Sequence, residues 1–195
     1  MQWQNSGTRY GVPAQTLHWG IVLLLLILFP LGWYMTGLPL GLEKFEAYQL
    51  HKSLGLVVLS VMLLRLAWRW RNPPPPAPAG LPSWMRLAAT FTHFALYGTL
   101  FLQVGLGIAM SFKANAPIAF FDLFSLPNPL TPDKKVAEWL STAHSWTGNA
   151  IVSLIALHAG AALWHHFVRR DDVLRRMLPF GANARNSSYP PTKTD

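Results

Sequence analysis

The sequence predicts an all-α integral membrane protein, a bundle of four transmembrane helices with both chain termini in the cytoplasm. Only 12% of its 195 residues are charged, about half the fraction that is usual in a soluble domain. Four apolar stretches approach or exceed the roughly 20 residues needed to cross a bilayer. We therefore expect one compact membrane domain, over residues 16–168, and no separate soluble module.

The four predicted helices begin and end where apolar runs meet polar or proline-rich sequence. Pro30 lies inside the first of them and should bend it or loosen one turn, which a membrane helix tolerates. The run of prolines that starts at Pro73 cannot continue the second helix and forms a stiff connector. The predicted helices cover about 16–36, 48–69, 84–112 and 138–168.

Tails and loops account for the rest of the chain. Residues 1–15 form an N-terminal tail without the features of a cleaved signal peptide, so we expect the first helix to stay in the mature protein. Residues 113–137 form a long loop whose IAFFDLF segment is apolar enough to lie on the interface. The basic tail over 169–195 should begin with a short amphipathic surface helix, and its last dozen residues should be disordered.

Positive charge is distributed unequally between the two ends of the predicted bundle. Cytoplasmic loops of membrane proteins carry the excess of Lys and Arg. One end has Arg9, Arg65, Arg69, Arg71, Arg86, Arg169, Arg170, Arg175, Arg176, Arg185 and Lys193, and the other has Lys44, Lys52, Lys113, Lys134 and Lys135. This places both termini and the proline-rich connector in the cytoplasm. It also explains the net charge of +8 without a nucleic-acid partner.

Two histidines in the fourth predicted helix are the first sign of function. His144 and His158 are fourteen residues apart, which places them about 40° apart around a helix axis and about 21 Å apart along it. Ionisable residues inside a membrane span mark functional sites by default. The two rings therefore face one direction at two depths.

Two more histidines match these depths. By the predicted topology, His51 lies at the outer level with His144, and His18 lies at the inner level with His158. Imidazole is a good axial ligand for haem iron, and bundle cores commonly hold cofactors between facing helices. The chain has no cysteine, which excludes thiolate sites, iron–sulfur clusters and covalent haem attachment. The pattern predicts two non-covalent haems, one in each leaflet.

Small residues follow the outer pair on the same helical face. Gly55 comes four residues after His51, and Gly148 four after His144, so both would leave room for a flat macrocycle beside the iron ligands. Small residues also serve helix packing, which is the plainer interpretation of either glycine alone.

Several alternatives remain open on the residues alone. His93 lies near the inner depth, and spacing does not decide which two of His18, His93 and His158 would bind the inner iron. Met35 and Met110 are conceivable ligands at the outer level. His165, seven residues after His158, faces the same way. It fits either a hydrogen-bond donor to a quinone or, with His166, a residue at headgroup level.

The chain resembles the prokaryotic cytochrome b561 family over nearly all of residues 9–178. The resemblance rests on RYG and HW in 9–19, HKSLG from His51, RLAWRWRNPPPP, HFALY, and LHAGAALWHHFVRRDDVLRRML. It implies four helices, b-type haems ligated by His18 with His158 and by His51 with His144, and no iron ligand at His93. It further implies that some members oxidise superoxide, reduce ubiquinone and place a histidine at the position of His165 near the quinone.

The resulting expectation is a bacterial inner-membrane electron carrier of the respiratory chain. It would link a small redox substrate or periplasmic redox protein to the quinone pool, with superoxide:ubiquinone oxidoreductase as one activity. The outer lysines would steer a small anion or dock an acidic partner. Two alternatives are a haem-bearing anchor subunit of a separate enzyme and a haem-free transporter with a histidine proton relay.

Overall fold

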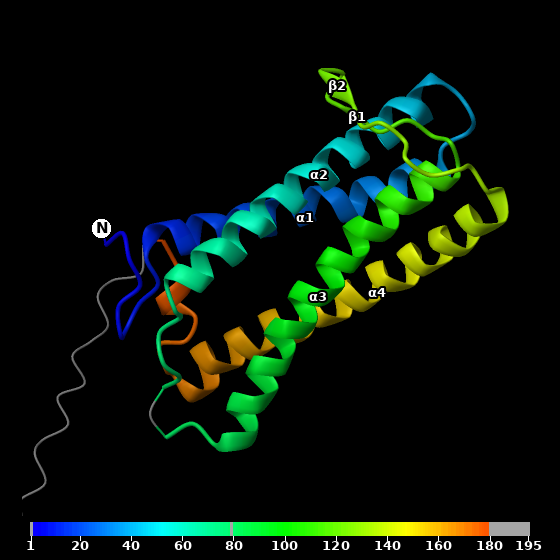
Figure 1. Cartoon of the computed structure of the whole chain (residues 1–195). Helices are drawn as coiled ribbons and strands as arrows, with labels where there is room; N and C mark the ends of the chain where they lie inside the picture. The colour runs from blue at the N-terminus through cyan, green and yellow to red at the C-terminus, as the bar shows by residue number, and fades with distance from the viewer. Residues whose placement is uncertain (1, 79, 180–195) are drawn as a thin grey trace, which may run out of the picture.

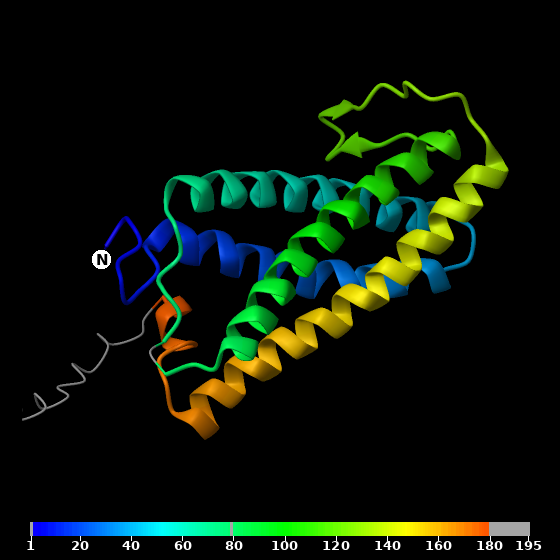
Figure 2. The ribbon, with the colours of Figure 1, turned by 60° about the horizontal axis from the view of Figure 1, so that its bottom comes forward.

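The structure, a computed structural model that describes residues 2–78 and 80–179, is built from four long helices in two pairs. Helix α1 (Val12–Gly37) lies alongside α2 (Leu42–Arg71), and α3 (Ser83–Lys113) lies alongside α4 (Lys134–Trp164). The two pairs cross each other, as Figures 1 and 2 show from two directions. All four helices are long and apolar enough to span a bilayer. The predicted all-α four-helix membrane bundle is confirmed.

The helices begin earlier than the apolar pattern predicts. Helix α1 starts at Val12 with a proline in its first turn, a position that suits its missing N–H. Helix α2 starts at Leu42 with Glu43 in its first turn, where a negative charge favours the helix dipole. Helix α4 starts at Lys134 because the side chain of Asp133 caps it, accepting a bond from Val136 N at 3.1 Å. The first turns of α2 and α4 carry charged residues, and that of α1 contains Pro13, so hydropathy alone does not reveal them.

A short hairpin interrupts the loop between α3 and α4, where we expected irregular chain. Strands β1 (Ala119–Phe120) and β2 (Phe124–Ser125) pair antiparallel. The turn between them has positive φ at Phe121 and Asp122. Ser53 of α2 holds it, since its hydroxyl donates to Ala119 O at 2.9 Å and accepts from Phe121 N at 3.0 Å. Ser53 is 66 to 68 residues from its two partners in sequence, so local sequence patterns do not predict these hydrogen bonds.

The best-buried residues lie where the two helix pairs cross. Met62 and Ile151 are completely buried, and Val58 is 1% exposed. They form one cluster with Ile21, Leu28 and Leu100, so every helix contributes. Ile151 lies midway along α4 between His144 and His158. The core is therefore a layer across the middle of the bundle that separates the two histidine levels.

Hydrogen bonds join three distant segments at one end of the bundle. Asn5 donates to Asn72 O at 2.9 Å, Arg9 donates to Leu178 O at 2.9 Å, and Arg176 donates to Pro76 O at 2.8 Å. The N-terminal tail, the proline-rich connector and the segment after α4 thus share this end (Figure 2).

The segment after α4 does not form the amphipathic helix that we expected. It contains a π-helical turn, η1 (His165–Arg169), a left-handed Arg170 and one 3₁₀ turn, η2 (Arg175–Met177). The left-handed residue reverses the chain and ends the helix. The disorder predicted for the last dozen residues lies outside the described residues.

Candidate functional site

A cavity opens between the four helices at the end away from the joined tails. Its volume is about 390 Å³, within the range of roughly 300–1,000 Å³ found for ligand and cofactor sites. All four helices line it, and both predicted outer histidines are among the lining residues. The rings of His51 and His144 lie 6.4 Å apart, centre to centre, with their planes at 73°. Met35 and Met110 also line this cavity.

The ring of His144 is oriented by a residue that the sequence did not reveal. Its Nδ1 lies 3.0 Å from the backbone oxygen of Gln103 on α3. A carbonyl only accepts, so Nδ1 must carry the proton. Nε2 is then an acceptor, and the side-chain amide of Gln103 donates to it at 3.1 Å. His144 is thereby held as the neutral imidazole with its lone pair on Nε2, the form that binds metals. The Gln103 amide, which donates to that lone pair here, would have to move aside for Nε2 to ligate a metal.

The ring of His51 presents a different signal. Its Nδ1 is buried and has no hydrogen-bond partner among the described residues. A buried polar atom without a partner costs roughly 1–3 kcal/mol. The cavity that His51 lines has room for a bound group, and contact with such a group would offset the cost of the unpartnered nitrogen.

Glycines surround the two outer rings, in a larger number than the sequence suggested. The predicted Gly55 and Gly148 both line the cavity. A Cβ at Gly55 would meet nothing within 4 Å, so its backbone faces open space, whereas one at Gly148 would lie 3.3 Å from the Gln103 amide. Gly32 and Gly107 were not predicted. A Cβ there would lie 3.4 Å from His51 and 3.2 Å from His144. Both are on neighbouring helices, so no spacing within one helix points to them.

Three histidines converge at the inner level. The ring of His158 lies 6.2 Å from that of His18, at 79°, and 5.3 Å from that of His93, at 69°. The three side chains come from α4, α1 and α3. Proximity to His158 therefore does not by itself decide whether His18 or His93 is the second ligand at the inner level.

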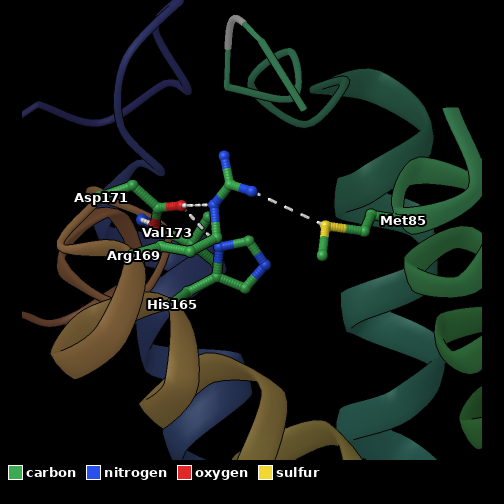
Figure 3. Close-up of polar contacts among 5 residues, drawn as sticks. All are labelled: Met85, His165, Arg169, Asp171 and Val173. Carbon is green, nitrogen blue, oxygen red and sulfur yellow. Dashed lines mark hydrogen bonds and ion pairs between the residues drawn. The ribbon is translucent and has the colours of Figure 1, made fainter. Parts of the chain in front are cut away.

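His165 is fixed by contacts that form because the chain turns back on itself. Its Nδ1 lies 2.5 Å from Asp171 Oδ2, and Arg169 Nε lies 3.4 Å from the same oxygen. The other oxygen of Asp171 accepts from Val173 N at 3.1 Å. Figure 3 shows this group, with Arg169 also reaching Met85 of α3. Asp171 was not predicted, because regular helical spacing would not bring it to His165.

The resemblance seen in the sequence was tested by comparison with known proteins. A family profile described as prokaryotic cytochrome b561 matches residues 9–180. The chain belongs to the prokaryotic cytochrome b561 family. It is 35% identical over 182 residues to cytochrome b561 homolog 2 of Escherichia coli K12, covering 91% of this chain and 95% of that protein.

Two further relatives extend this result. Cytochrome b561 homolog 1 of the same organism is 31% identical over 175 residues, which is 88% of this chain and 97% of the relative. A protein of Yersinia pestis named probable superoxide oxidase CybB is 29% identical over 177 residues, which is 88% of this chain and 96% of the relative. Membership confirms a bacterial multi-pass inner-membrane protein of electron transport that binds b-type haem. It leaves the haem-free transporter without support.

The residues present suit a b-type haem. Within residues 2–78 and 80–179, no three His, Cys, Asp or Glu side chains group closely enough to hold a metal ion by themselves. A haem iron is already held by four porphyrin nitrogens and needs only axial ligands from the protein. The outer cavity, with two facing imidazoles, glycine-lined walls and an unpartnered ring nitrogen, meets this requirement.

Proposed function

We propose that this protein carries electrons across the membrane through two b-type haems, one at each histidine level. The observation that carries the proposal is the equal spacing of two ring pairs, 6.4 Å for His51 with His144 and 6.2 Å for His18 with His158. An iron between two imidazole nitrogens at about 2 Å each, with roughly 1 Å from nitrogen to ring centre, separates the ring centres by about 6 Å.

Ring separation also favours His18 over His93 as the partner of His158. The rings of His93 and His158 are 5.3 Å apart, which is almost 1 Å too close to admit an iron between them on this estimate. Their spacing also breaks the match between the two levels. His93 is then a neighbour of the inner site and not a ligand.

The role of the chain is to hold two exchange sites at fixed depths. Bound haem supplies one-electron exchange between the ferric and ferrous states. Helix α4 provides one ligand at each level, fourteen residues apart, so the ligands are separated by about 21 Å along the helix. Gln103 fixes the tautomer of His144. The buried layer of Val58, Met62 and Ile151 excludes water between the two levels.

We further propose that both termini are cytoplasmic. The end where the tails and connector join is also the end that carries most of the Arg residues, as the positive-inside rule requires. The outer cavity then faces the periplasmic leaflet. In this orientation, His165 and Asp171 lie near the cytoplasmic surface.

The pair of His165 and Asp171 supports a quinone site next to the inner haem. The carboxylate accepts from Nδ1, and no hydrogen bond from residues 2–78 or 80–179 engages Nε2, so Nε2 can exchange a hydrogen bond or proton with a quinone oxygen. Orientation of a histidine by a carboxylate is the usual means of fixing its tautomer. We propose that electrons leave the chain here, to ubiquinone.

The donor at the outer face is proposed to be superoxide. The Yersinia pestis relative named probable superoxide oxidase supports this choice. Of the five outer lysines, Lys52 alone lines the cavity, where its cation would attract a small anion. Lys52 also donates to Pro117 O at 2.8 Å, which holds it at this position. Five acidic residues at this end balance the charge of the five lysines: Glu43, Glu46, Asp122, Asp133 and Glu138. Lys52 would therefore attract an anion only close to the cavity.

A spectroscopic measurement on the purified protein tests the proposed function. We expect a reduced b-type spectrum, about two haems per chain by pyridine haemochrome assay, and low-spin ferric signals of high anisotropy in electron paramagnetic resonance. The last expectation follows because the ring planes in both pairs lie nearer perpendicular than parallel. One haem per chain, or high-spin iron, would contradict the proposal.

Substitution of Gly107 by alanine should weaken binding of the outer haem. The new Cβ would lie 3.2 Å from the His144 ring, so the ring must shift from its position. We expect the rate at which the outer haem transfers to excess apomyoglobin to rise severalfold. Gly105→Ala on the same helix is the control, since a Cβ there meets nothing within 4 Å. Equal rates in the two variants would show that the close approach of α3 to His144 is unimportant.

Substitution of Asp171 by asparagine should slow ubiquinone reduction. The variant removes the charge that orients His165, and loss of such orienting partners typically costs about 10–100-fold. Reoxidation of the reduced haems by ubiquinone, followed by stopped flow, measures this step. Asp172→Asn is a matched control, because Asp172, the next residue, forms an ion pair with Arg175 at 3.8 Å and none with His165. A wild-type reoxidation rate in Asp171→Asn would remove the pair from the quinone site.

A further inference from the structure

An arginine with a buried, unpartnered nitrogen lies at the inner level. Arg65 comes fourteen residues after His51 on α2, the same separation that takes α4 from His144 to His158. It therefore lies on nearly the same face of α2, one haem level deeper. Its Nε donates to the hydroxyl of Tyr97 on α3 at 2.8 Å, but its Nη1 is buried without a partner among the residues that the structure describes. Tyr97 itself follows His93 by one helical turn.

A second donor without a partner among the described residues and another arginine lie beside Arg65. The indole Nε1 of Trp68 is buried and has no partner in the described part of the chain, and Arg69 lies one turn beyond Arg65. A small cavity of about 20 Å³ adjoins these three side chains, and Tyr10 and Tyr97 also line it. Burial raises the pKa of Tyr10, against the opposing effect of the nearby arginines, so its phenol stays neutral.

No carboxylate of the described residues balances this positive charge. The acidic side chains at this end are Asp171, which pairs with His165 and Arg169, and Asp172, which pairs with Arg175. Arg69 and Arg71 lie in the last turn of α2, where cations suit the helix dipole. Arg65 is outside that turn, and its Nη1 does not reach solvent as a snorkelling arginine would. A guanidinium with a buried, unpartnered N–H and no counter-charge nearby is costly, so this side chain is suited to bind an anion.

We propose that Arg65, with Arg69 and the indole of Trp68 beside it, binds a carboxylate, and that this carboxylate is a propionate of the inner haem. This inference rests on the proposed haem between His18 and His158. Ala14, one turn before His18, lines the same cavity, so the site adjoins the inner pair. Guanidinium groups bind carboxylates in a bidentate geometry that neither a water molecule nor Tyr97 supplies.

The test compares Arg65→Ala with Arg65→Lys and with Arg71→Ala, an exposed arginine of the same helix end, in the purified haem-loaded protein. Redox titration should show a lower midpoint potential for one haem in Arg65→Ala, partial recovery in Arg65→Lys, and no change in Arg71→Ala. Resonance Raman spectra should show a shift of that haem's propionate bending band in Arg65→Ala. A structural role alone would not shift this band.

Two results would overturn the inference. One is an unchanged propionate band and unchanged potentials in Arg65→Ala with both haems retained. The other is a lipid dependence that needs Arg65. If the midpoint potential differs between phosphatidylglycerol and phosphatidylcholine vesicles in the wild type but not in Arg65→Ala, the site binds a lipid phosphate instead. Failure of the underlying proposal is distinguishable, because His158→Ala would then leave the haem content unchanged.

Discussion

Replacing His144 by alanine should reduce the haem content of the purified protein from about two per chain to about one. The outer iron loses the ligand that Gln103 orients, while the inner pair lies on the other side of the buried core layer. Haem per chain and the redox titration should both show that only one component is lost. His51→Ala should have the same effect, because its ring faces that of His144 at 6.4 Å.

His166→Ala is the control for this experiment. It removes a histidine from the end of the same helix that belongs to neither ring pair, and it should keep both haems. Retention of both haems in His144→Ala would contradict the outer assignment. Loss of both, with loss of helical circular dichroism, would show misfolding, and His144→Gln would then be the variant to examine.

The second large effect concerns the inner level, where His158→Ala should remove the other haem and His93→Ala should not. The structure places both His18 and His93 beside His158, at 6.2 and 5.3 Å between ring centres. Only the longer separation fits an iron between the rings. Haem content of the three single variants, His18→Ala, His93→Ala and His158→Ala, measures the difference directly.

The contrary outcome is also specific. If His93→Ala loses a haem and His18→Ala keeps both, the inner ligands are His93 and His158. The equal spacing of the two ring pairs would then be a coincidence. A change in the inner haem's potential in His93→Ala, with both haems present, would instead agree with a neighbouring residue.

Features set by local sequence were predictable. Length and apolar composition identify four spans, and helical spacing places His144 and His158 on one face at two depths. The structure brings His51 to His144 and His18 to His158 as the topology suggested. Such spacing does not separate His93 from His18, because depth along a helix is known only to about one turn.

Features that depend on contacts between distant segments were not predictable. The hairpin of β1 and β2 is held by Ser53, and Asp171 reaches His165 only because η1 and the left-handed Arg170 turn the chain back. Gln103 and Gly107 act on His144 from another helix. In each case the sequence shows an ordinary residue, and only the packing shows what it contacts.

The central claim, an electron path from the outer histidine pair through the inner pair to quinone, is tested most directly by stopped flow on the protein in liposomes that contain ubiquinone. Superoxide supplied at the outer face should reduce haem rapidly, and reoxidation should follow only when ubiquinone is present. In His158→Ala, reduction of the outer haem should persist and reoxidation should fail. Reoxidation at the wild-type rate in that variant, or haems that superoxide does not reduce, would contradict the account.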